Sequence, residues 1–189
     1  MPFEQCKSIN SLMSGFNKPW FFAGGWAIDL YLGKETRHHQ DIEISIFRKD
    51  QLELKSFLKD WELKKVSSGE FLPWQDEFLE LPIHEIHALN NSMGQKLEIL
   101  LNETKGDYWL FRRDLTTTYP LYSVYSVSQM GYRYLNPEIV LLYKAKNTRE
   151  KDNQDFLAVK DNLDKNKKKW LQKAICSQYP EHEWLKLLI

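Results

Sequence analysis

The chain has 189 residues, of which 42% are hydrophobic, enough for one compact domain or two small lobes, and this excludes global disorder. Its 26 basic and 26 acidic residues give a formal charge of zero, so bulk electrostatic capture of DNA or RNA is not expected. No apolar run approaches the roughly 18–20 residues of a membrane span and the N-terminus carries no secretory signal, so we expect a cytoplasmic protein without a membrane segment.

Predicted helices and strands alternate along the first half of the sequence. Apolar residues at helical spacing predict helices at 3–16, 26–32 and 51–59. Short apolar or alternating runs predict strands at 20–23, 41–47, 61–66, 83–89, 96–101 and 109–111. From Pro137, which suits a helix start, the pattern is helical, with further helices at 151–163 and 165–178. We therefore predict an α+β fold, with a mixed α/β lobe at 1–115 followed by a smaller, mostly helical lobe at 116–189.

The most informative stretch is the run AGGWAIDLYLGKETRHHQDIEISIF at residues 23–47. It predicts a strand, a Gly24-Gly25 turn, a helix, a second turn and a second strand. Asp41 and Glu43 point to one face of that second strand, while the isoleucines between and after them point into a core. Carboxylate oxygens are the ligands that Mg²⁺ prefers, and free N–H groups at a helix start bind phosphate. The stretch predicts a site for two divalent cations and a nucleoside triphosphate, although acids two apart on an exposed strand are also common without metal.

A site for two metal ions usually needs a third carboxylate from a neighbouring strand. Glu98 is the best candidate, because it is an acid inside the otherwise apolar run Leu97 to Leu101. The alternative is an acid on an edge strand that faces solvent. Glu103 is a second candidate, but its position is more typical of a loop.

The glycines and Arg37 each have a structural alternative. Gly24 and Gly25 suit a tight strand-to-helix turn with positive φ, and the missing side chains also permit a close approach of phosphate to the backbone. Arg37 can neutralise phosphate or pair with an acid, and the sequence does not decide between the two.

The segment His84-Glu85-Ile86-His87 resembles a zinc motif only superficially. The metalloprotease motif needs two histidines four residues apart on a helix, whereas here they are three apart. On a strand they would face opposite sides. We therefore expect no metal site from this pair of histidines.

Residues 66–95 contain five acids and neither lysine nor arginine. If this stretch borders an acceptor pocket, it would favour a cationic or polyhydroxylated acceptor. An ordinary acidic surface is the alternative. We expect Glu80 and Glu85, together with Trp74, on the acceptor side of a cleft between the lobes.

The Gly-Gly turn and the Asp-x-Glu strand resemble those of the polymerase-β-type nucleotidyltransferases. More narrowly, residues 24–44 are similar to the 2″-adenylyltransferase type of the aminoglycoside and lincosamide branch. A second block, YLNPEIVLLYKAKNTREKDNQDF at residues 134–156, is similar to the helical half of relatives. Two departures stand out, because Gln40 takes the place of a frequent acid and Glu43 that of the commoner second aspartate.

The resemblance implies a polymerase-β-like lobe with a mixed sheet. It also implies a reaction that transfers a nucleoside monophosphate, AMP from ATP, to a hydroxyl of a small molecule such as an aminoglycoside and releases pyrophosphate. It implies that Asp41 and Glu43 hold two Mg²⁺ ions. Glu98 stands where the family has its third acid, which can also serve as general base. A lysine on the first helix of the second lobe, Lys144 or Lys146, can reach the triphosphate in relatives, although either also suits a solvated helix face.

Two rival functions remain open from the sequence. One is a toxin-type transferase that acts on a protein side chain or a tRNA end, although the neutral charge and the lack of a basic arm disfavour RNA. The other is a catalytically silent nucleotide-binding protein, which the unusual Glu43 and the missing acid at position 40 keep open.

Overall fold

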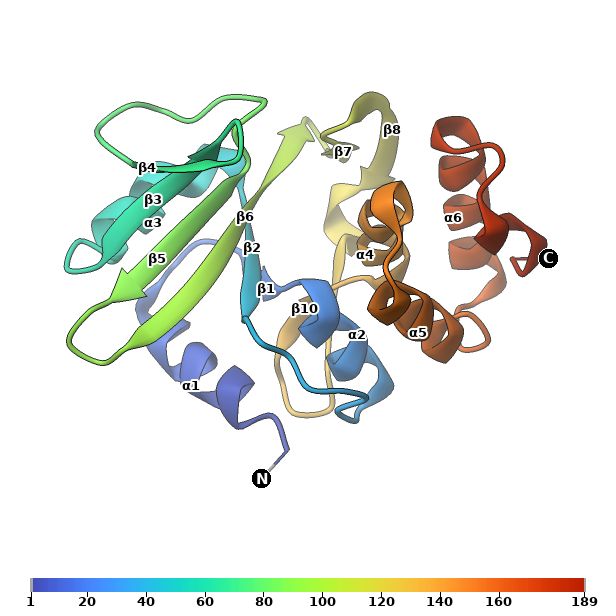
Figure 1. Ribbon diagram of the computed structural model, residues 1–189, viewed down its shortest axis with the longest axis horizontal. Coiled ribbons are helices and arrows are strands. Elements are labelled where there is room, and N and C mark those ends of the chain that lie inside the picture. The colour runs from blue at the N-terminus through green and yellow to red at the C-terminus, as the bar shows by residue number, and fades with distance from the viewer. Residues whose placement is uncertain (1, 189) are drawn as a thin grey trace.

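The computed structural model describes residues 2–188, and its centre is one mixed sheet (Figure 1). The strands are β1 (Trp20–Phe22), β2 (Glu43–Phe47), β3 (Glu62–Ser67), β4 (Glu70–Pro73), β5 (Glu85–Asn90), β6 (Gln95–Lys105), β7 (Tyr108–Phe111), β8 (Asp114–Pro120), β9 (Tyr125–Val127) and β10 (Arg133–Leu135). The α-helices are α1 (Glu4–Leu12), α2 (Gly24–Leu32), α3 (Gln51–Phe57), α4 (Pro137–Lys144), α5 (Glu150–Val159) and α6 (Lys165–Gln178). Helices and a mixed sheet confirm the predicted α+β class.

The sheet has the strand order β4-β3-β5-β6-β2-β1-β10-β9, and β7 and β8 extend it from the far part of β6. Strand β2 pairs in parallel with β6 and antiparallel with β1. Strand β1 pairs in parallel with β10, which comes much later in the chain. The strand that carries Glu43 therefore lies in the middle of the sheet, where neighbours on both sides fix its position.

The two faces of β2 have different surroundings, as the alternation of its residues predicts. Ile44 and Ile46 are fully buried in the main core, together with Ile99 of β6 and residues of α1 and α3. Burying each of these side chains stabilises the fold by about 1.5–3 kcal/mol. Glu43 and Ser45 point to the other face, so the core side chains determine which face carries the carboxylates.

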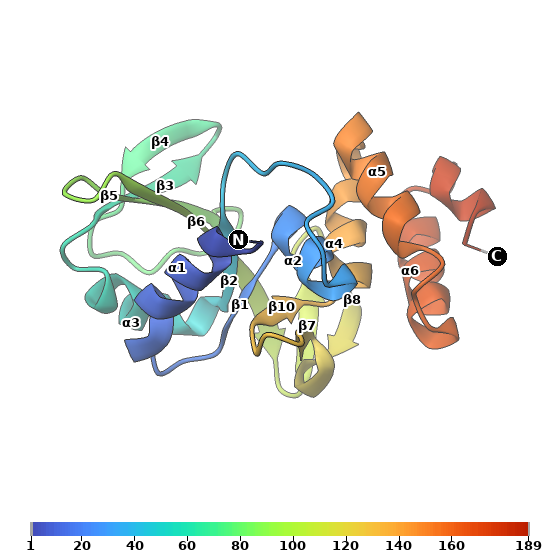
Figure 2. The ribbon, with the colours of Figure 1, turned by 90° about the horizontal axis from the view of Figure 1, so that it is seen from below.

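The helices gather at opposite ends of the sheet. Helices α1 and α3 lie beside β3, β5 and β6, whereas α4, α5 and α6 lie at the far end, with α2 between the two groups (Figures 1 and 2). Helix α4 contacts α2, α5 and α6. Within residues 2–188, no helix is long and apolar enough to cross a lipid bilayer.

The helical part begins later than residue 116. That position lies within β8, and β9 and β10 still belong to the sheet. The predicted helix start at Pro137 is confirmed, with Asn136 as the residue that precedes it. Four strands, β4, β8, β9 and β10, were not predicted, because they are either short or largely exposed and so lack the apolar alternation of a core strand.

Candidate active site

The Gly24-Gly25 turn and Glu43 fit against each other closely. Gly24 has φ of 55°, and a Cβ atom there would lie 1.2 Å from Glu43 Oε2. The backbone N–H of Gly25 donates to the Glu43 carboxylate. A Cβ atom at Gly25 would lie 2.4 Å from Arg37 Nη2. The two glycines thus make room for Glu43 on one side and for Arg37 on the other.

We predict that Gly24→Ala displaces the Glu43 carboxylate, and Gly33→Ala is the matched control. Both glycines have positive φ, so alanine at either should cost about 1–2 kcal/mol of stability. Only Gly24 has Glu43 against it, because no atom lies within 4 Å of the Cβ position at Gly33. Urea unfolding should show a larger loss for Gly24→Ala, and turnover should fall for that variant alone. Equal losses in both variants would contradict the contact.

Glu98 lies directly across from Glu43 in the parallel β2–β6 ladder. The Glu98 N–H donates to the carbonyl of Ile42 at 3.0 Å, and Asp41 is an exposed residue just before β2. Burial, with the nearby charges of Glu43 and Asp41, raises the pKa of Glu98 to about 7. Burial also raises the pKa of Glu43, against the opposing effect of Lys144. Glu43 and Asp41 thus lie near enough to Glu98 for their charges to disfavour its ionised form, and a cation between these acids would relieve that repulsion.

The raised pKa of Glu98 predicts a pH-dependent effect of Glu98→Gln in protein free of divalent cations. Between its ordinary value of 4.5 and about 7, the folded state keeps a proton that the unfolded state releases, so the free energy of unfolding falls as pH rises. Glutamine removes that loss. Melting temperatures should therefore rise for Glu98→Gln at about pH 8 but not at about pH 4, whereas Glu80→Gln, at an exposed position, should change little at either pH. A stabilisation that does not vary with pH would contradict the assignment.

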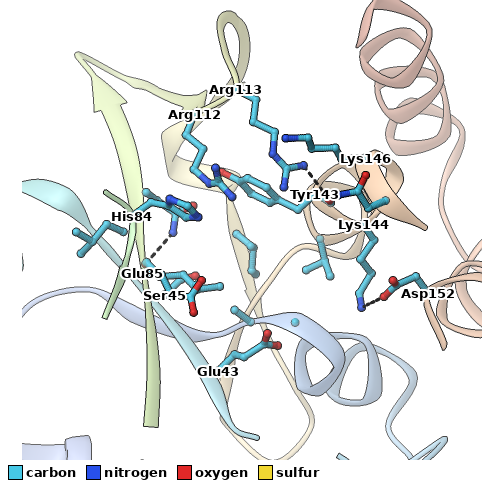
Figure 3. A pocket seen from close by; sticks show the side chains of 18 of the residues that line it. Glu43, Ser45, His84, Glu85, Arg112, Arg113, Tyr143, Lys144, Lys146 and Asp152 are labelled. Atoms are coloured by element: carbon cyan, nitrogen blue, oxygen red, sulfur yellow. Dashed lines mark hydrogen bonds and ion pairs between the residues drawn. The ribbon is translucent and has the colours of Figure 1, made fainter. Parts of the chain in front are cut away.

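A cavity of about 500 Å³ opens on the Gly24 side of Glu43, between the sheet and the helical part (Figure 3). Basic side chains dominate its lining: Arg112, Arg113, Lys144, Lys146 and Arg149. Tyr143 contacts both arginines: Arg113 donates a hydrogen bond to the Tyr143 backbone carbonyl at 2.9 Å, and the Arg112 guanidinium lies 5.4 Å from the centre of the Tyr143 ring. The five basic side chains outnumber the acids of the lining, which are Glu43, Glu85 and Asp152, and the backbone turn that starts α2 forms part of the wall.

A second cavity of about 620 Å³ lies on the other side of the carboxylates. Asp41 and Glu98 border it, and Phe71 of β4 contributes an exposed aromatic ring. The remaining lining mixes apolar side chains with polar ones, which include the amides of Gln5, Gln40 and Gln95. Glu43 thus lines the first cavity, while Asp41 and Glu98 line the second.

The lysine and arginine predicted for the site have several acidic partners. Lys144 Nζ lies 2.7 Å from Asp152 and 2.9 Å from Asp155, while Arg37 binds both oxygens of Asp155 at 3.1 Å. Although burial alone raises the pKa of Asp152, hydrogen bonds from Arg149 and Lys144 outweigh it and lower that pKa to about 2. Of the two roles considered for Arg37, phosphate binding and pairing with an acid, the structure shows the pairing with an acid. Arg37 does not line the basic cavity.

Some expected residues lie elsewhere. Glu103 pairs with Arg48 at 2.6 Å, away from Glu43, so it is not the third carboxylate. Trp74 is buried, with Lys55 Nζ 5.5 Å from its ring centre, and it borders neither of the two cavities. Glu80 is exposed and also lies outside both cavities. The expectation for Trp74 and Glu80 was wrong. Glu85 does border a cavity, but the basic one.

Arg112, Arg113 and Arg149 were not among the predicted site residues, and His87 was considered only together with His84. The first two follow directly after β7, so a signal was present as a basic pair at the end of an apolar strand. The position of His87 depends on the antiparallel register of β5 and β6, which places this residue opposite Glu98. That register is a non-local property and leaves no local motif.

The chain has known relatives in sequence and in fold. The sequence profile of the aminoglycoside-2″-adenylyltransferase family matches residues 5–158. The solution structure of the antibiotic-resistance factor ANT(2″)-Ia is 18% identical, with a TM-score of 0.63 and 95% of each chain covered.

A crystal structure of ANT(2″)-Ia in complex with adenylyl-2″-tobramycin has a TM-score of 0.62 at 18% identity, covering 93% of this chain and 97% of that one. The lincomycin-bound lincosamide adenylyltransferase LnuA has a TM-score of 0.59 at 17% identity, covering 85% and 97%. No protein of curated function matches the chain by sequence. At these identities the structures show the shared polymerase-β-like fold, whereas the profile covers most of the chain. The chain therefore belongs to the aminoglycoside-2″-adenylyltransferase family and is a nucleotidyltransferase.

Proposed function

We propose that this protein transfers the AMP unit of ATP to a hydroxyl of a small, polyhydroxylated acceptor and releases pyrophosphate. The observation that supports the proposal is the pairing of Glu43 with Glu98 on adjacent strands, with Glu43 bordering the basic cavity and Asp41 and Glu98 bordering the second cavity. Such an arrangement suits a reaction between an anionic donor and an uncharged or cationic acceptor. The relatives that bind aminoglycoside and lincosamide antibiotics make those compounds the first acceptors to test.

Asp41, Glu43 and Glu98 would hold Mg²⁺. The fit rests on the donor set, which is all carboxylate oxygen. Burial is the main cause of the raised pKa values of Glu43 and Glu98, and a bound cation would favour their ionised forms. When bound, two Mg²⁺ ions supply activation of the acceptor oxygen and stabilisation of the leaving pyrophosphate.

The basic cavity would bind the triphosphate. Lys146, Arg112 and Arg113 line it and carry the positive charge that a phosphate chain requires. Lys144 also faces this cavity, but Asp152 and Asp155 hold its ammonium group. We infer that Lys144 keeps the helical part close to Glu43 and that the less constrained Lys146 binds phosphate.

The second cavity, which Asp41 and Glu98 border, would bind the acceptor. Amide side chains and the exposed ring of Phe71 offer hydrogen bonds and a stacking surface for a sugar-like molecule. Glu98 borders this cavity, so one of its carboxylate oxygens can accept the hydroxyl proton as the acceptor attacks. A cation held beside Glu98 would lower the pKa of this carboxyl and keep it ionised.

The test is nucleotide binding and transfer with and without magnesium. We expect ATP binding by calorimetry to require Mg²⁺, because the acids around Glu43 repel a triphosphate unless a cation lies between them. ATP labelled at its α-phosphate, incubated with aminoglycosides and lincosamides, should label an acceptor only when Mg²⁺ is present. Labelling of a protein or a tRNA instead would overturn the small-molecule acceptor. Equally tight ATP binding in a chelator would overturn the metal-dependent site.

A further inference from the structure

A second group of ligand-type side chains lies on the open face of strands β5 and β6. Glu85, His87 and Glu98 each offer one ligand atom, and these atoms all lie within 4.8 Å of one another. His87 is directly opposite Glu98 in the antiparallel ladder, and Glu85 lies two residues before His87 on the same face. The backbone pairing of two adjacent strands thus fixes all three positions.

The imidazole of His87 lies between the two carboxylates. Its Nε2 is 2.6 Å from Glu85 Oε1, and its Nδ1 is 3.9 Å from Glu98 Oε1. The ring of Phe71 packs edge-on against it at 4.7 Å between ring centres. The three side chains are 23–30% exposed, so an ion from solvent can reach them without local unfolding.

We propose that Glu85, His87 and Glu98 bind one transition-metal ion, and that Zn²⁺ fits this set best. One imidazole and two carboxylates leave a coordination position open for water, as in zinc sites that are not closed by a fourth side chain. Mg²⁺ favours oxygen ligands alone, so the imidazole separates this site chemically from the one proposed at Asp41 and Glu43.

This site is unrelated to the zinc motif that the sequence analysis excluded. His84 is outside the group, because its Nδ1 binds the carbonyl of Pro82 at 2.8 Å. The second carboxylate comes instead from Glu98, on the neighbouring strand. The two histidines of one short segment therefore provide a test residue and a control of the same type.

The consequence for the enzyme depends on the proposed function. Glu98 belongs both to this group and to the set of acids that would hold magnesium and accept the hydroxyl proton. A zinc ion on Glu85 and His87 would occupy the Glu98 carboxylate and prevent both tasks. We therefore infer that zinc inhibits nucleotidyl transfer through a site that His87 defines.

The first experiment measures zinc binding alone. Protein freed of metal with a chelator is titrated with Zn²⁺ in competition with a colorimetric zinc indicator, in excess Mg²⁺ and without nucleotide or acceptor. We expect one zinc per chain. Loss of even an outer-shell partner lowers metal affinity about 10–100-fold, so His87→Gln should weaken binding by at least about tenfold, and His84→Gln should not. Thermal melting without metal checks that both variants are folded.

Co²⁺ provides a spectroscopic readout, since its visible absorption should appear with the wild type and with His84→Gln and be lost in His87→Gln. Unchanged zinc affinity in folded His87→Gln would overturn the site. So would zinc that excess Mg²⁺ displaces completely, because the ion would then occupy an oxygen-only site.

The second experiment measures AMP transfer at fixed Mg²⁺–ATP while zinc increases. Inhibition in the wild type that requires at least about tenfold more zinc in His87→Gln would support the shared use of Glu98. Zinc binding without inhibition would overturn that consequence. Absence of transfer in every sample would instead contradict the proposed function, and the binding measurements would still decide the zinc site.

Discussion

Glu43→Gln is expected to lower the rate of AMP transfer on the order of a thousandfold or more. The carboxylate would bind the metal ions that stabilise transition-state charge by several kcal/mol, and each 1.36 kcal/mol changes the rate tenfold. Glutamine keeps the shape and can still accept the Gly25 N–H. Because burial raises the pKa of Glu43, removing its charge should leave the metal-free protein at least as stable as the wild type.

Glu70→Gln is the matched control, since Glu70 is an exposed acid on β4 outside both cavities. Turnover under saturating ATP and acceptor should be unchanged in this variant. Calorimetry should show that Glu43→Gln loses the magnesium dependence of ATP binding. Turnover of Glu43→Gln within tenfold of the wild type would show that the metal ions, and with them the chemistry, lie elsewhere.

Asp155→Ala is expected to destabilise the fold by about 3–5 kcal/mol, the cost of leaving buried charges without their partner. The Asp155 side chain is 1% exposed and binds Arg37 and Lys144, whose own side chains are 18% and 10% exposed. Arg37 belongs to the loop before β2 and Lys144 to the end of α4, so this acid joins the sheet to the helical part. Urea unfolding would measure the loss.

Asp161→Ala is the matched control for this ion pair. Asp161 binds Lys160 on the surface and has a side chain that is 74% exposed, so its removal should cost no more than about 1 kcal/mol. A small loss for Asp155→Ala, similar to that of Asp161→Ala, would mean that water replaces the aspartate between the two basic side chains. The link between the two parts would then be far weaker than its burial indicates.

The sequence predicted those parts of the fold that local patterns determine. The alternation of Asp41-Ile42-Glu43-Ile44 fixes which side of β2 is buried, and Pro137 marks the start of α4. It missed β4 and β8 to β10, because pairing with other strands, rather than local composition, makes those segments extended. Strand β2 also begins at Glu43, two residues later than predicted, which leaves Asp41 in the bend before it.

The candidate site was predictable to the extent that it follows from one motif and one strand. Glu98 could be named because a lone acid in an apolar strand is unusual, and the ladder places it opposite Glu43. The partner of Arg37 could not be named, since Asp155 lies far along the chain and only the tertiary fold brings the two together. The prediction that Trp74 borders the acceptor was wrong, because an aromatic residue near acids is equally compatible with a core position. In the structure Trp74 is buried in the core.

The parallel pairing of β1 with β10 affects how the chain can be assembled and divided. Until residues 133–135 leave the ribosome, β1 has a partner on only one side, and the backbone groups of its other edge are open. The sheet around Glu43 is therefore completed late in synthesis, by a segment adjacent to the helical part. A fragment that ends near residue 115 lacks β10, so it would expose the unpaired backbone edge of β1 to pairing with other chains. We therefore expect that the two parts of this enzyme cannot be exchanged as independent modules during evolution or in engineered chimaeras.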